Sequence, residues 1–588
     1  MKTIGDILAR DLTKQIEEVI QVNQTDEHSV YSEITEYVAT HRIKDHYREL
    51  FAAMAEAPSE PTEGVGIWVS GFFGSGKSSF AKNLGYVLSN PNLLGEPASE
   101  LFKIQVKDKR ISEFLDLINV KIPTEVVMFD VSKGSEVRRA EEKIAEIVYR
   151  ALLNHLDYAT DYDVAELEIE LEGQKRLDEF VALCQEVNGR DWQIARKGAM
   201  KLNYASAILN RMDPKVFPAA DSWAKSLGQR NTTITVETVV DRTFELTARR
   251  RPGKAIAFII DEVGRYVAHS ANKIEDLRAL VEQFGEVSKN YLKAKKAIAP
   301  VWIVVTSQEK LDEVVDAIGT KRVDIAKLQD RFRHRVDLAP ADIREVATKR
   351  VLAKRDEAKP ILKKLFGESQ GILNAACRLE RTQKRTEVTE DDFIQFYPYL
   401  PHYIEMSIDI MSGIRLQPGA PKHYGGSNRT IIKQAYEMLV SERTGLAGKP
   451  IGTLVTLDKI FELVEGNLSS EKQKDISDIA LRFRTDSEDR GMAARVAKTI
   501  ALLEFVRDVP RTEANIAACL VDAVGQPAPR AEVESAIKKL QDGKFVRNTE
   551  EGWKLQTNQE KNWETERRGF EARPKDRNEI TRDPTRHL

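Results

Sequence analysis

The feature that most constrains this chain is a glycine-rich turn between an apolar stretch and a helix-like stretch. Residues 66–85 read GIWVSGFFGSGKSSFAKNLG and match the pattern G-x-x-x-x-G-K-[ST] from Gly71 to Ser78. In such a loop several backbone N–H groups point inward at the start of a helix, and glycines permit that close approach. A glycine-rich turn can match by chance, but here a predicted strand precedes the loop and a predicted helix follows it. The pattern therefore predicts a loop that wraps a polyphosphate.

The residues of this loop suggest ATP and Mg²⁺ as its ligands. We expect the ammonium of Lys77 to reach the β- and γ-phosphates, and the hydroxyl of Ser78 to ligate Mg²⁺. The residues expected to contact the nucleotide are Gly71, Phe72, Phe73, Gly74, Ser75, Gly76, Lys77, Ser78 and Ser79.

A second motif follows the apolar run at residues 253–262, GKAIAFIIDE, which ends in two acids. We expect Asp261 to help hold Mg²⁺, through water, and Glu262 to polarise the water that attacks the γ-phosphate. The alternative is that both acids only begin a loop after a buried strand. The apolar runs at 124–132 and 301–308 carry no such acidic pair, so this Walker B assignment has little competition.

Polar residues at the end of VWIVVTSQ, residues 301–308, are candidates for a sensor of the γ-phosphate. Thr306, Ser307 or Gln308 would place a polar side chain next to the phosphate and the attacking water. The alternative is a strand that simply ends in polar residues.

Two arginines are candidates for further contacts with the γ-phosphate. Arg331 precedes the predicted strand 334–338, where an arginine finger could reach the site of a neighbouring subunit; the alternative is a solvated basic edge. Arg429 stands at the start of a predicted helix and is a candidate second sensor. Alternatively Asn428 caps that helix and Arg429 faces water.

Short apolar runs separated by helices predict an α/β fold, with a parallel sheet buried on both faces. The pattern divides the chain into six regions. These are an N-terminal helical region (1–57), an α/β core (58–339) with a helical insertion at about 157–230, a helical lid (340–440), a helical connector (441–492), a winged-helix-like domain (493–557) and a polar tail expected to be disordered (558–588).

Composition excludes several classes of protein. The formal net charge of −3 argues against a uniformly basic protein that coats nucleic acid, although DNA binding by a local basic face stays open. Three separated cysteines provide neither a disulfide framework nor a zinc site. No apolar run reaches the roughly 18–20 residues of a membrane span, so we expect a cytoplasmic protein without a membrane partner.

The order of motifs resembles the AAA+ ATPases, particularly the branch of the origin-recognition initiators. The resemblance covers about 65–440, and the winged-helix likeness about 493–557. It implies ATP hydrolysis in a homo-oligomer, with an arginine supplied by the adjacent protomer. The span from Lys77 to Asp261 is longer than in a minimal AAA+ core, which is why a helical insertion is expected.

A closer resemblance is carried by the N-terminal region and by GFFGSGKSSFAK and AFIIDEVGRYV. These phrases are similar to the BrxC family of BREX anti-phage systems, which is related to PglY. Members of that family are considerably longer, so an amino-terminal portion or a shortened form is expected. The resemblance implies BREX partners, namely a PglX-type methyltransferase, a PglZ-type protein and BrxB, in systems that methylate host DNA and block phage replication.

Three functions follow from these observations. The first is an oligomeric ATPase that couples nucleotide state to assembly of a defence complex, and the second is a nucleotide-dependent switch or scaffold with negligible turnover. The third is an initiator-like DNA clamp or loader acting through the winged helix. For the third, the basic residues of 530–547 are opposed by Glu532, Glu534, Asp542 and the pair Glu550-Glu551.

Overall fold

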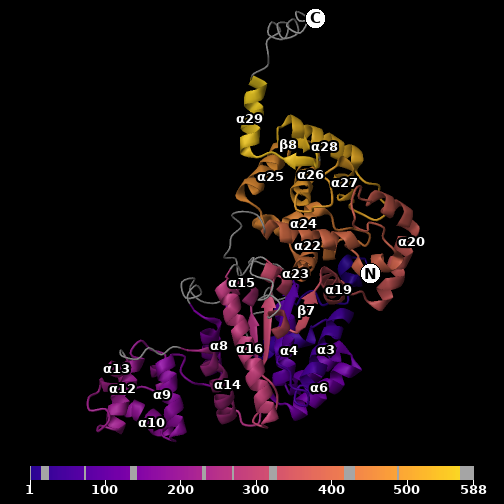
Figure 1. Cartoon of the computed structure of the whole chain (residues 1–588). Coiled ribbons are helices and arrows are strands. Elements are labelled where there is room, and N and C mark those ends of the chain that lie inside the picture. Colours follow the sequence, from indigo (N-terminus) through magenta and orange to yellow (C-terminus); the bar gives the residue numbers. More distant parts are fainter. Residues whose placement is uncertain are drawn as a thin grey trace, which may run out of the picture. The chain divides into compact units, whose positions relative to one another are not determined.

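The computed structural model describes residues 2–14, 26–71, 75–132, 142–227, 234–267, 270–316, 328–415, 431–486, 489 and 491–569. The chain forms two compact units (Figure 1). One unit comprises residues 20–342, and the other comprises residues 1–19 together with 343–588. Each unit is described below by itself.

A five-stranded parallel sheet forms the centre of the unit 20–342. Its strands are β1 (Gly66–Gly71), β4 (Thr124–Asp130), β5 (Ala255–Asp261), β6 (Trp302–Ser307) and β7 (His334–Leu338), each where the sequence predicts a strand. Their order across the sheet is β4-β5-β6-β1-β7. The strand that leads into the glycine loop, β1, thus lies between β6 and β7, the last two strands of the sheet in chain order. The predicted α/β fold is confirmed.

Burial on both faces explains why β5 and β6 read as nearly continuous apolar runs. Every residue of β5 is buried, and so is every residue of β6. In a parallel sheet the carboxyl ends of all strands meet at one edge. The register places Asp130 beside Asp261, and Ser70 beside Ser307, at that edge. Open α/β sheets bind ligands in the crevice outside this edge.

Helices cover the sheet and fix the position of the glycine loop. Helix α4 (Lys77–Ser89) follows the loop and packs on β4, β5 and β6. A Cβ at Gly85 would lie 2.7 Å from Ile259 Cδ1, so a glycine lets α4 lie close to the sheet. The remaining elements of this region of the chain are α2 (Glu27–Thr35), α3 (His41–Glu56), β2 (Asn92–Leu93), β3 (Glu96–Pro97), α5 (Ala98–Val106), α6 (Lys109–Lys121), α15 (Val263–Val267), α16 (Ala271–Lys293) and α17 (Leu311–Asp316).

Between β4 and β5 the described residues form helices only, as the sequence predicts for the insertion. They are α8 (Ile144–His155), α9 (Tyr162–Gly173), α10 (Leu177–Asn188), α11 (Trp192–Ala195), α12 (Lys201–Met212), α13 (Ser222–Leu227) and α14 (Val236–Arg250). Figure 1 shows α9, α10, α12 and α13 as a lobe to one side of α8 and α14.

The insertion lobe has a small core of its own. The rings of Phe180 and Trp192 meet edge to face at 4.9 Å. The buried carboxylate of Glu168 accepts hydrogen bonds from Trp192 Nε1 at 2.6 Å and from the guanidinium of Arg196. A buried charge is tolerated only when it is paired and hydrogen-bonded, and here Arg196 supplies the opposite charge.

The other unit is helical and includes the start of the chain. Its elements up to the winged helix are α1 (Ile4–Ile7), α19 (Pro340–Arg350, which begins in the other unit), η1 (Asp356–Ala358), α20 (Lys359–Ala376), α21 (Glu390–Phe396), α22 (Pro401–Arg415), α23 (Ile431–Val440), η2 (Leu446–Gly448), α24 (Leu457–Val464), η3 (Glu465–Asn467) and α25 (Ser470–Arg482).

The structure divides the predicted N-terminal region 1–57 between the two units. The N–H of Ile4 donates to the carbonyl of Lys449 at 2.9 Å, and the N–H of Ala9 donates to the carbonyl of Ala353 at 2.8 Å. These backbone bonds join the first residues to the helical unit, whereas α2 and α3 belong to the unit of the sheet.

The winged-helix order of the sequence is present in α26 (Met492–Leu503), α27 (Glu513–Ala518), α28 (Arg530–Asp542) and the hairpin of β8 (Val546–Thr549) and β9 (Gly552–Leu555). The hairpin turns at residues 550–551. Among the described residues no helix is both long and apolar enough to span a membrane.

The expectation of disorder from residue 558 onward is wrong for its first part, because α29 (Asn558–Gly569) is a helix. Thr557 and Glu560 form a capping box: the N–H of Glu560 donates to the Thr557 hydroxyl and the N–H of Thr557 donates to the Glu560 carboxylate. Lys561 adds an ion pair with Asp475 of α25. The polar composition of this segment led to the expectation of disorder, whereas the T-x-x-E spacing of Thr557 and Glu560 indicates the start of a helix.

Candidate nucleotide-binding site

Helix α4, which follows the glycine loop, and strand β5 meet directly at the carboxyl edge of the sheet. The hydroxyl of Ser78, in the first turn of α4, donates to the carboxylate of Asp261 at 2.9 Å. Lys77 is the first residue of α4 and is buried beside them. Its positive charge lowers the pKa of both Asp261 and Glu262. The structure thus brings together four residues that the sequence predicted to share a site.

The glycines of the loop are required by its geometry. Gly76 has a φ of +90°, in the left-handed region that favours glycine. A Cβ at Gly71 would lie 2.5 Å from Ser75 Oγ and 3.0 Å from the carbonyl of Leu338. Phe72, Phe73 and Gly74, which the sequence also assigned to the nucleotide site, lie outside the described residues.

Of the candidate sensor residues, Thr306 reaches the site. Its hydroxyl donates to the Asp261 carboxylate and accepts from the N–H of Glu262 at 3.0 Å. Ser307 points to the opposite face, as successive strand residues do. There its hydroxyl accepts from the N–H of Glu309, and its side chain packs against Gly264. Ser307 therefore supports α15, and Thr306 is the sensor candidate that the geometry favours.

Glu262 is held in an unusual backbone conformation. Its φ is +61°, a left-handed value that is uncommon for a residue other than glycine and costs about 1–3 kcal/mol. The side-chain amide of Gln308, the third polar residue in VWIVVTSQ, donates to the Glu262 carboxylate at 3.3 Å. Thr306 therefore fixes the backbone of Glu262, and Gln308 fixes its carboxylate.

The acids of the site are held with raised pKa values. Burial raises the pKa of the Asp261 carboxyl above its usual value, against the hydrogen bonds from Thr306 and Ser78, which lower it. Burial likewise raises the pKa of Glu262, and the neighbouring charge of Asp261 raises it further. Asp130, at the end of β4, raises both. Asp130 is not among the residues predicted for the site, although it ends the apolar run 124–130 as Asp261 ends the run of β5.

The set of donors fits a nucleotide with Mg²⁺. Ser78 and Asp261 supply the hydroxyl and carboxylate oxygens that a hard cation prefers. The Ser75 hydroxyl is buried in the loop and has no hydrogen-bond partner among the described residues, as expected for a group that faces a phosphate. A divalent cation bound there would favour the ionised form of both acids, against the burial that raises their pKa values.

Arg331 lies at the opposite edge of the sheet from this site. A Cβ at Gly66, where β1 begins, would lie 2.6 Å from the Arg331 carbonyl. The guanidinium of Arg331 pairs with Glu282 at 2.6 Å and with Glu63 at 3.0 Å. It therefore cannot serve the phosphate site of its own chain. A role at a neighbour's site would require these ion pairs to be exchanged.

The two other arginines of this segment differ from Arg331. Arg335 pairs with Asp312 at 3.1 Å. Arg333 is exposed and has no ion pair among the described residues. Arg429 and Asn428, the candidate second sensor and its alternative cap, lie outside the described residues.

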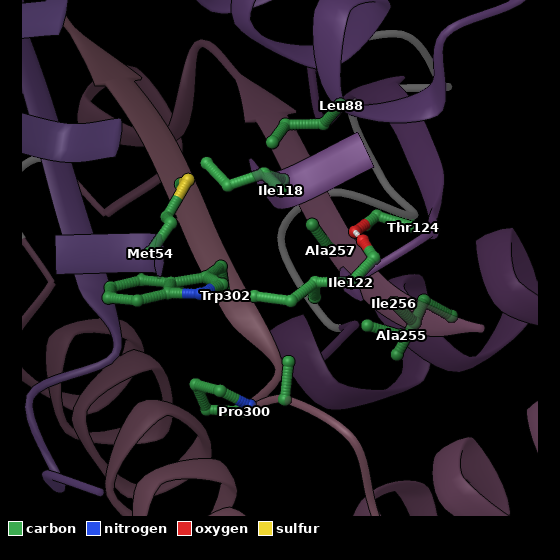
Figure 2. A pocket seen from close by; sticks show the side chains of 11 residues that line it. Met54, Leu88, Ile118, Ile122, Thr124, Ala255, Ile256, Ala257, Pro300 and Trp302 are labelled. Atoms are coloured by element: carbon green, nitrogen blue, oxygen red, sulfur yellow. Dashed lines mark hydrogen bonds between the residues drawn. The ribbon is translucent and has the colours of Figure 1, made fainter. Parts of the chain in front are cut away.

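A pocket at the start of the strands is of a different kind (Figure 2). It is lined by Met54, Leu88, Ile118, Ile122, Thr124, Ala255, Ile256, Ala257, Ala299, Pro300 and Trp302. Ten of these eleven side chains are apolar, or aromatic in the case of Trp302, and only Thr124 carries a hydroxyl. The Thr124 hydroxyl itself donates to the carbonyl of Ile122. Without converging polar groups, this pocket has no means to bind phosphate.

No protein-family model matches the chain. Three solved structures resemble it at low similarity. They are Cdc6p from Pyrobaculum aerophilum (11% identity, 92% of this chain and 96% of that chain, TM-score 0.30), the Orc1 protein of Aeropyrum pernix in complex with DNA (10%, 91% and 94%, 0.30) and a Walker-type ATPase of Pyrococcus abyssi (12%, 89% and 97%, 0.22). At these values the similarity does not identify a function. The fold assignment rests on the strand order and on the site where Ser78 meets Asp261.

Proposed function

We propose that this chain is an AAA+ ATPase that binds ATP with Mg²⁺ and hydrolyses it to ADP and phosphate. The observation that carries the proposal is the hydrogen bond between Ser78 and Asp261, because it unites the phosphate-binding helix with the acidic end of β5. Glu262 follows immediately, with its backbone fixed by Thr306 and its carboxylate by Gln308. The residues proposed to bind phosphate and those proposed to activate water thus lie together at the carboxyl edge of the sheet.

The residues divide the work of the reaction. Lys77 would neutralise charge on the β- and γ-phosphates, and Ser78 and Asp261 would hold Mg²⁺. When bound, Mg²⁺ supplies charge neutralisation at the phosphate oxygens. Glu262 would orient the attacking water and accept its hydrogen bond. Thr306 links the acid that holds the cation to the acid that orients the water. Catalysis of this kind is positioning together with charge stabilisation.

We further propose that the active form is a homo-oligomer with an arginine supplied in trans. The support is the position of the segment 331–335 at the edge of the sheet remote from its own site. Arg331 is the candidate from the sequence, and the exposed Arg333 is its neighbour in the same segment.

Steady-state phosphate release distinguishes an ATPase from a switch or scaffold. The proposal predicts many phosphates released per chain, with release lost in Lys77→Ala. A switch would bind ATP and release at most about one phosphate per chain. The assay is run with the chain alone and then with DNA or partner proteins, because turnover that requires a partner would not be detected with the chain alone. Turnover that Lys77→Ala does not reduce would contradict the proposal.

A role in a BREX-type anti-phage system is a finer proposal, supported by the phrases GFFGSGKSSFAK and AFIIDEVGRYV and by the N-terminal region. It predicts nucleotide-dependent association with a PglX-type methyltransferase, a PglZ-type protein or BrxB. Co-expression and size-exclusion chromatography, with ATP and with ADP, test it. If the chain associates with none of the three proteins, with ATP or with ADP, the proposal is contradicted.

An initiator-like DNA clamp or loader is the second candidate function. Arg530 and Lys538 on α28 favour it, because both are exposed and neither has an ion pair among the described residues. Against it, Lys539 pairs with Asp486, and Arg547 pairs with Glu560. One of the similar solved structures is an Orc1 protein in complex with DNA.

The salt dependence of affinity for duplex DNA tests this second candidate. Phosphate contacts by Arg530 and Lys538 predict that Arg530→Glu/Lys538→Glu weakens binding and reduces the salt slope by about 2. The matched control is Lys539→Glu/Arg547→Glu, which changes two basic side chains that already form ion pairs within the chain. Affinity that is absent, or independent of salt, would contradict phosphate contacts.

A further inference from the structure

The short helix α15 connects the Walker B turn to the base of the helical insertion. It begins directly after Glu262, and the N–H of Tyr266 donates to the Glu262 carbonyl at 3.3 Å. The side chain of Tyr266 is only 8% exposed, and its hydroxyl donates to the carbonyl of Glu142. Glu142 lies two residues before α8, the helix that leads into the insertion. One residue therefore bonds both to the glutamate expected to orient water and to the segment before the insertion.

The contacts continue from Glu142 into the lobe. The Glu142 carboxylate pairs with Arg150 of α8. The guanidinium of Arg150 lies 5.6 Å from the centre of the Tyr162 ring and donates to the Tyr162 hydroxyl at 3.3 Å. Tyr162 is the first residue of α9, and its hydroxyl donates to the carbonyl of Glu146 at 2.8 Å. The first helix of the lobe is thus held to α8 by directional contacts.

A second set of contacts strengthens the same joint. The rings of Tyr149 and Tyr162 stack at 5.8 Å. The hydroxyl of Tyr149 donates to Glu166 of α9 at 2.8 Å, and Glu166 pairs with Arg242 of α14. Helices α8, α9 and α14 therefore meet around a connected group of aromatic and charged side chains.

Several features distinguish this joint from ordinary packing. Half-buried hydrogen bonds and ion pairs specify their partners and angles, whereas apolar contacts allow sliding. This series of contacts begins at Glu262, whose left-handed φ of +61° makes its turn sensitive to any change in the position of α15. Coupling between sites is carried by such contiguous networks when both ends bias the same element.

We propose that Tyr266 is a positioning residue that couples the nucleotide site to the helical insertion. The proposal rests on the proposed function, because it requires that nucleotide binds at the site of Ser78, Asp261 and Glu262. Nucleotide at the site shifts α15, and the Tyr266 hydroxyl passes the shift through Glu142 and Arg150 to Tyr162. By linkage, a protein held by the insertion changes the affinity for nucleotide by the same factor.

The test is hydrogen exchange of the full chain with and without Mg²⁺ and the non-hydrolysable analogue AMP-PNP. In the wild type, AMP-PNP changes the exchange of peptides from both 257–267 and α9 (162–173). In Tyr266→Phe the change at 257–267 remains, and the change in α9 falls by at least about half. Tyr162→Phe, which removes the hydroxyl at the other end of the route, gives the same loss. The matched control is Tyr204→Phe in α12, whose hydroxyl has no hydrogen-bond partner among the described residues.

Kinetics give a second readout that loss of stability would not produce. Tyr266→Phe lowers kcat by about 10-fold, because α15, which carries the turn of Glu262, loses its hydrogen bond to Glu142, and it changes the KM for ATP much less. Tyr204→Phe leaves kcat unchanged. A wild type whose α9 does not respond to bound AMP-PNP, or a Tyr266→Phe variant that responds fully, overturns the inference alone. Failure of the wild type to bind AMP-PNP overturns the proposed function as well.

Discussion

The hydroxyl of Ser78 and the carboxylate of Asp261 lie 2.9 Å apart, although 183 positions separate them in the chain. The parallel sheet produces this contact, because β1 and β5 both end at the carboxyl edge with only β6 between them. The helical insertion lengthens the chain between the two residues without moving them apart. The two residues proposed to hold the cation are therefore in direct contact in the folded chain.

Ser78→Ala removes the hydroxyl of this pair, and we expect it to weaken ATP binding by about 10–100-fold in the presence of Mg²⁺. Binding in excess EDTA should change much less, because the hydroxyl acts through the cation. Titration with a fluorescent ATP analogue measures both. Ser89→Ala is the matched control: it removes another hydroxyl of α4, one that bonds only to helix carbonyls. Equal weakening with and without Mg²⁺ would contradict the assignment of Ser78 as a cation ligand.

Gly264→Ala tests the contact between α15 and β6. A Cβ at residue 264 would lie 2.0 Å from Ser307 Oγ and 3.0 Å from its Cα, so α15 must shift away from the strand. We expect a loss of stability of about 1–3 kcal/mol, together with lower turnover, since α15 carries the turn of Glu262. Ser307→Gly removes the atoms nearest to the clash. The double variant should therefore recover part of the loss, and a double variant no better than Gly264→Ala would contradict this explanation.

Arg331→Ala tests whether the arginine acts in trans or only within its own chain. Loss of the ion pairs with Glu63 and Glu282 alone should cost about 1 kcal/mol or less of stability. If Arg331 serves a neighbour, hydrolysis should fall far more than this loss explains. Arg335→Ala, which breaks the exposed pair with Asp312, is the control.

Mixing two inactive variants gives the sharper form of this test. In a mixed oligomer, a chain with Arg331→Ala keeps Glu262, and it receives an intact Arg331 from a neighbour that carries Glu262→Gln. Activity that returns on mixing supports an arginine in trans. If Arg331→Ala hydrolyses ATP at the wild-type rate, Arg331 is not the finger, and the same experiment with Arg333→Ala follows.

The raised pKa of Glu262 predicts how its neutral analogue changes stability with pH. The unfolded residue ionises near pH 4.3, whereas burial and the charge of Asp261 oppose ionisation in the folded chain. Ionised Glu262 thus lowers stability, in an amount that grows as the pH rises from about 4 through the folded pKa. Without nucleotide, Glu262→Gln should melt at a higher temperature than the wild type at pH 8, and at about the same temperature near pH 4. A melting temperature at pH 8 no higher than that of the wild type would contradict the environment described for this acid.

Much of the fold could be predicted because buried parallel strands leave a strong trace in sequence. Four of the five strands appear as short apolar runs, and Asp261 and Glu262 stand at the end of one of them. The glycine loop was recognisable because its backbone conformation restricts which residues can stand at Gly71 and Gly76. These features are local, so the sequence alone expresses them.

The remaining details depend on contacts between distant residues. Thr306 faces Asp261 and Ser307 faces Gly264 because successive residues of a strand point to opposite faces. Which residue faces which neighbour can be assigned only once the register is known. The ion pairs of Arg331 with Glu63 and Glu282 join three segments whose proximity no local pattern indicates. The joining of the first residues to the helical unit likewise follows from backbone bonds to residues more than 300 positions away.

The central claim is that Ser78, Asp261 and Glu262 form a site of ATP hydrolysis. The measurement that tests it most directly is ATP affinity and steady-state phosphate release for the wild type and for Glu262→Gln under the same conditions. The account predicts that the variant binds ATP with an affinity within about threefold of the wild type and releases phosphate at least about 100-fold more slowly. Wild-type phosphate release by Glu262→Gln would contradict it.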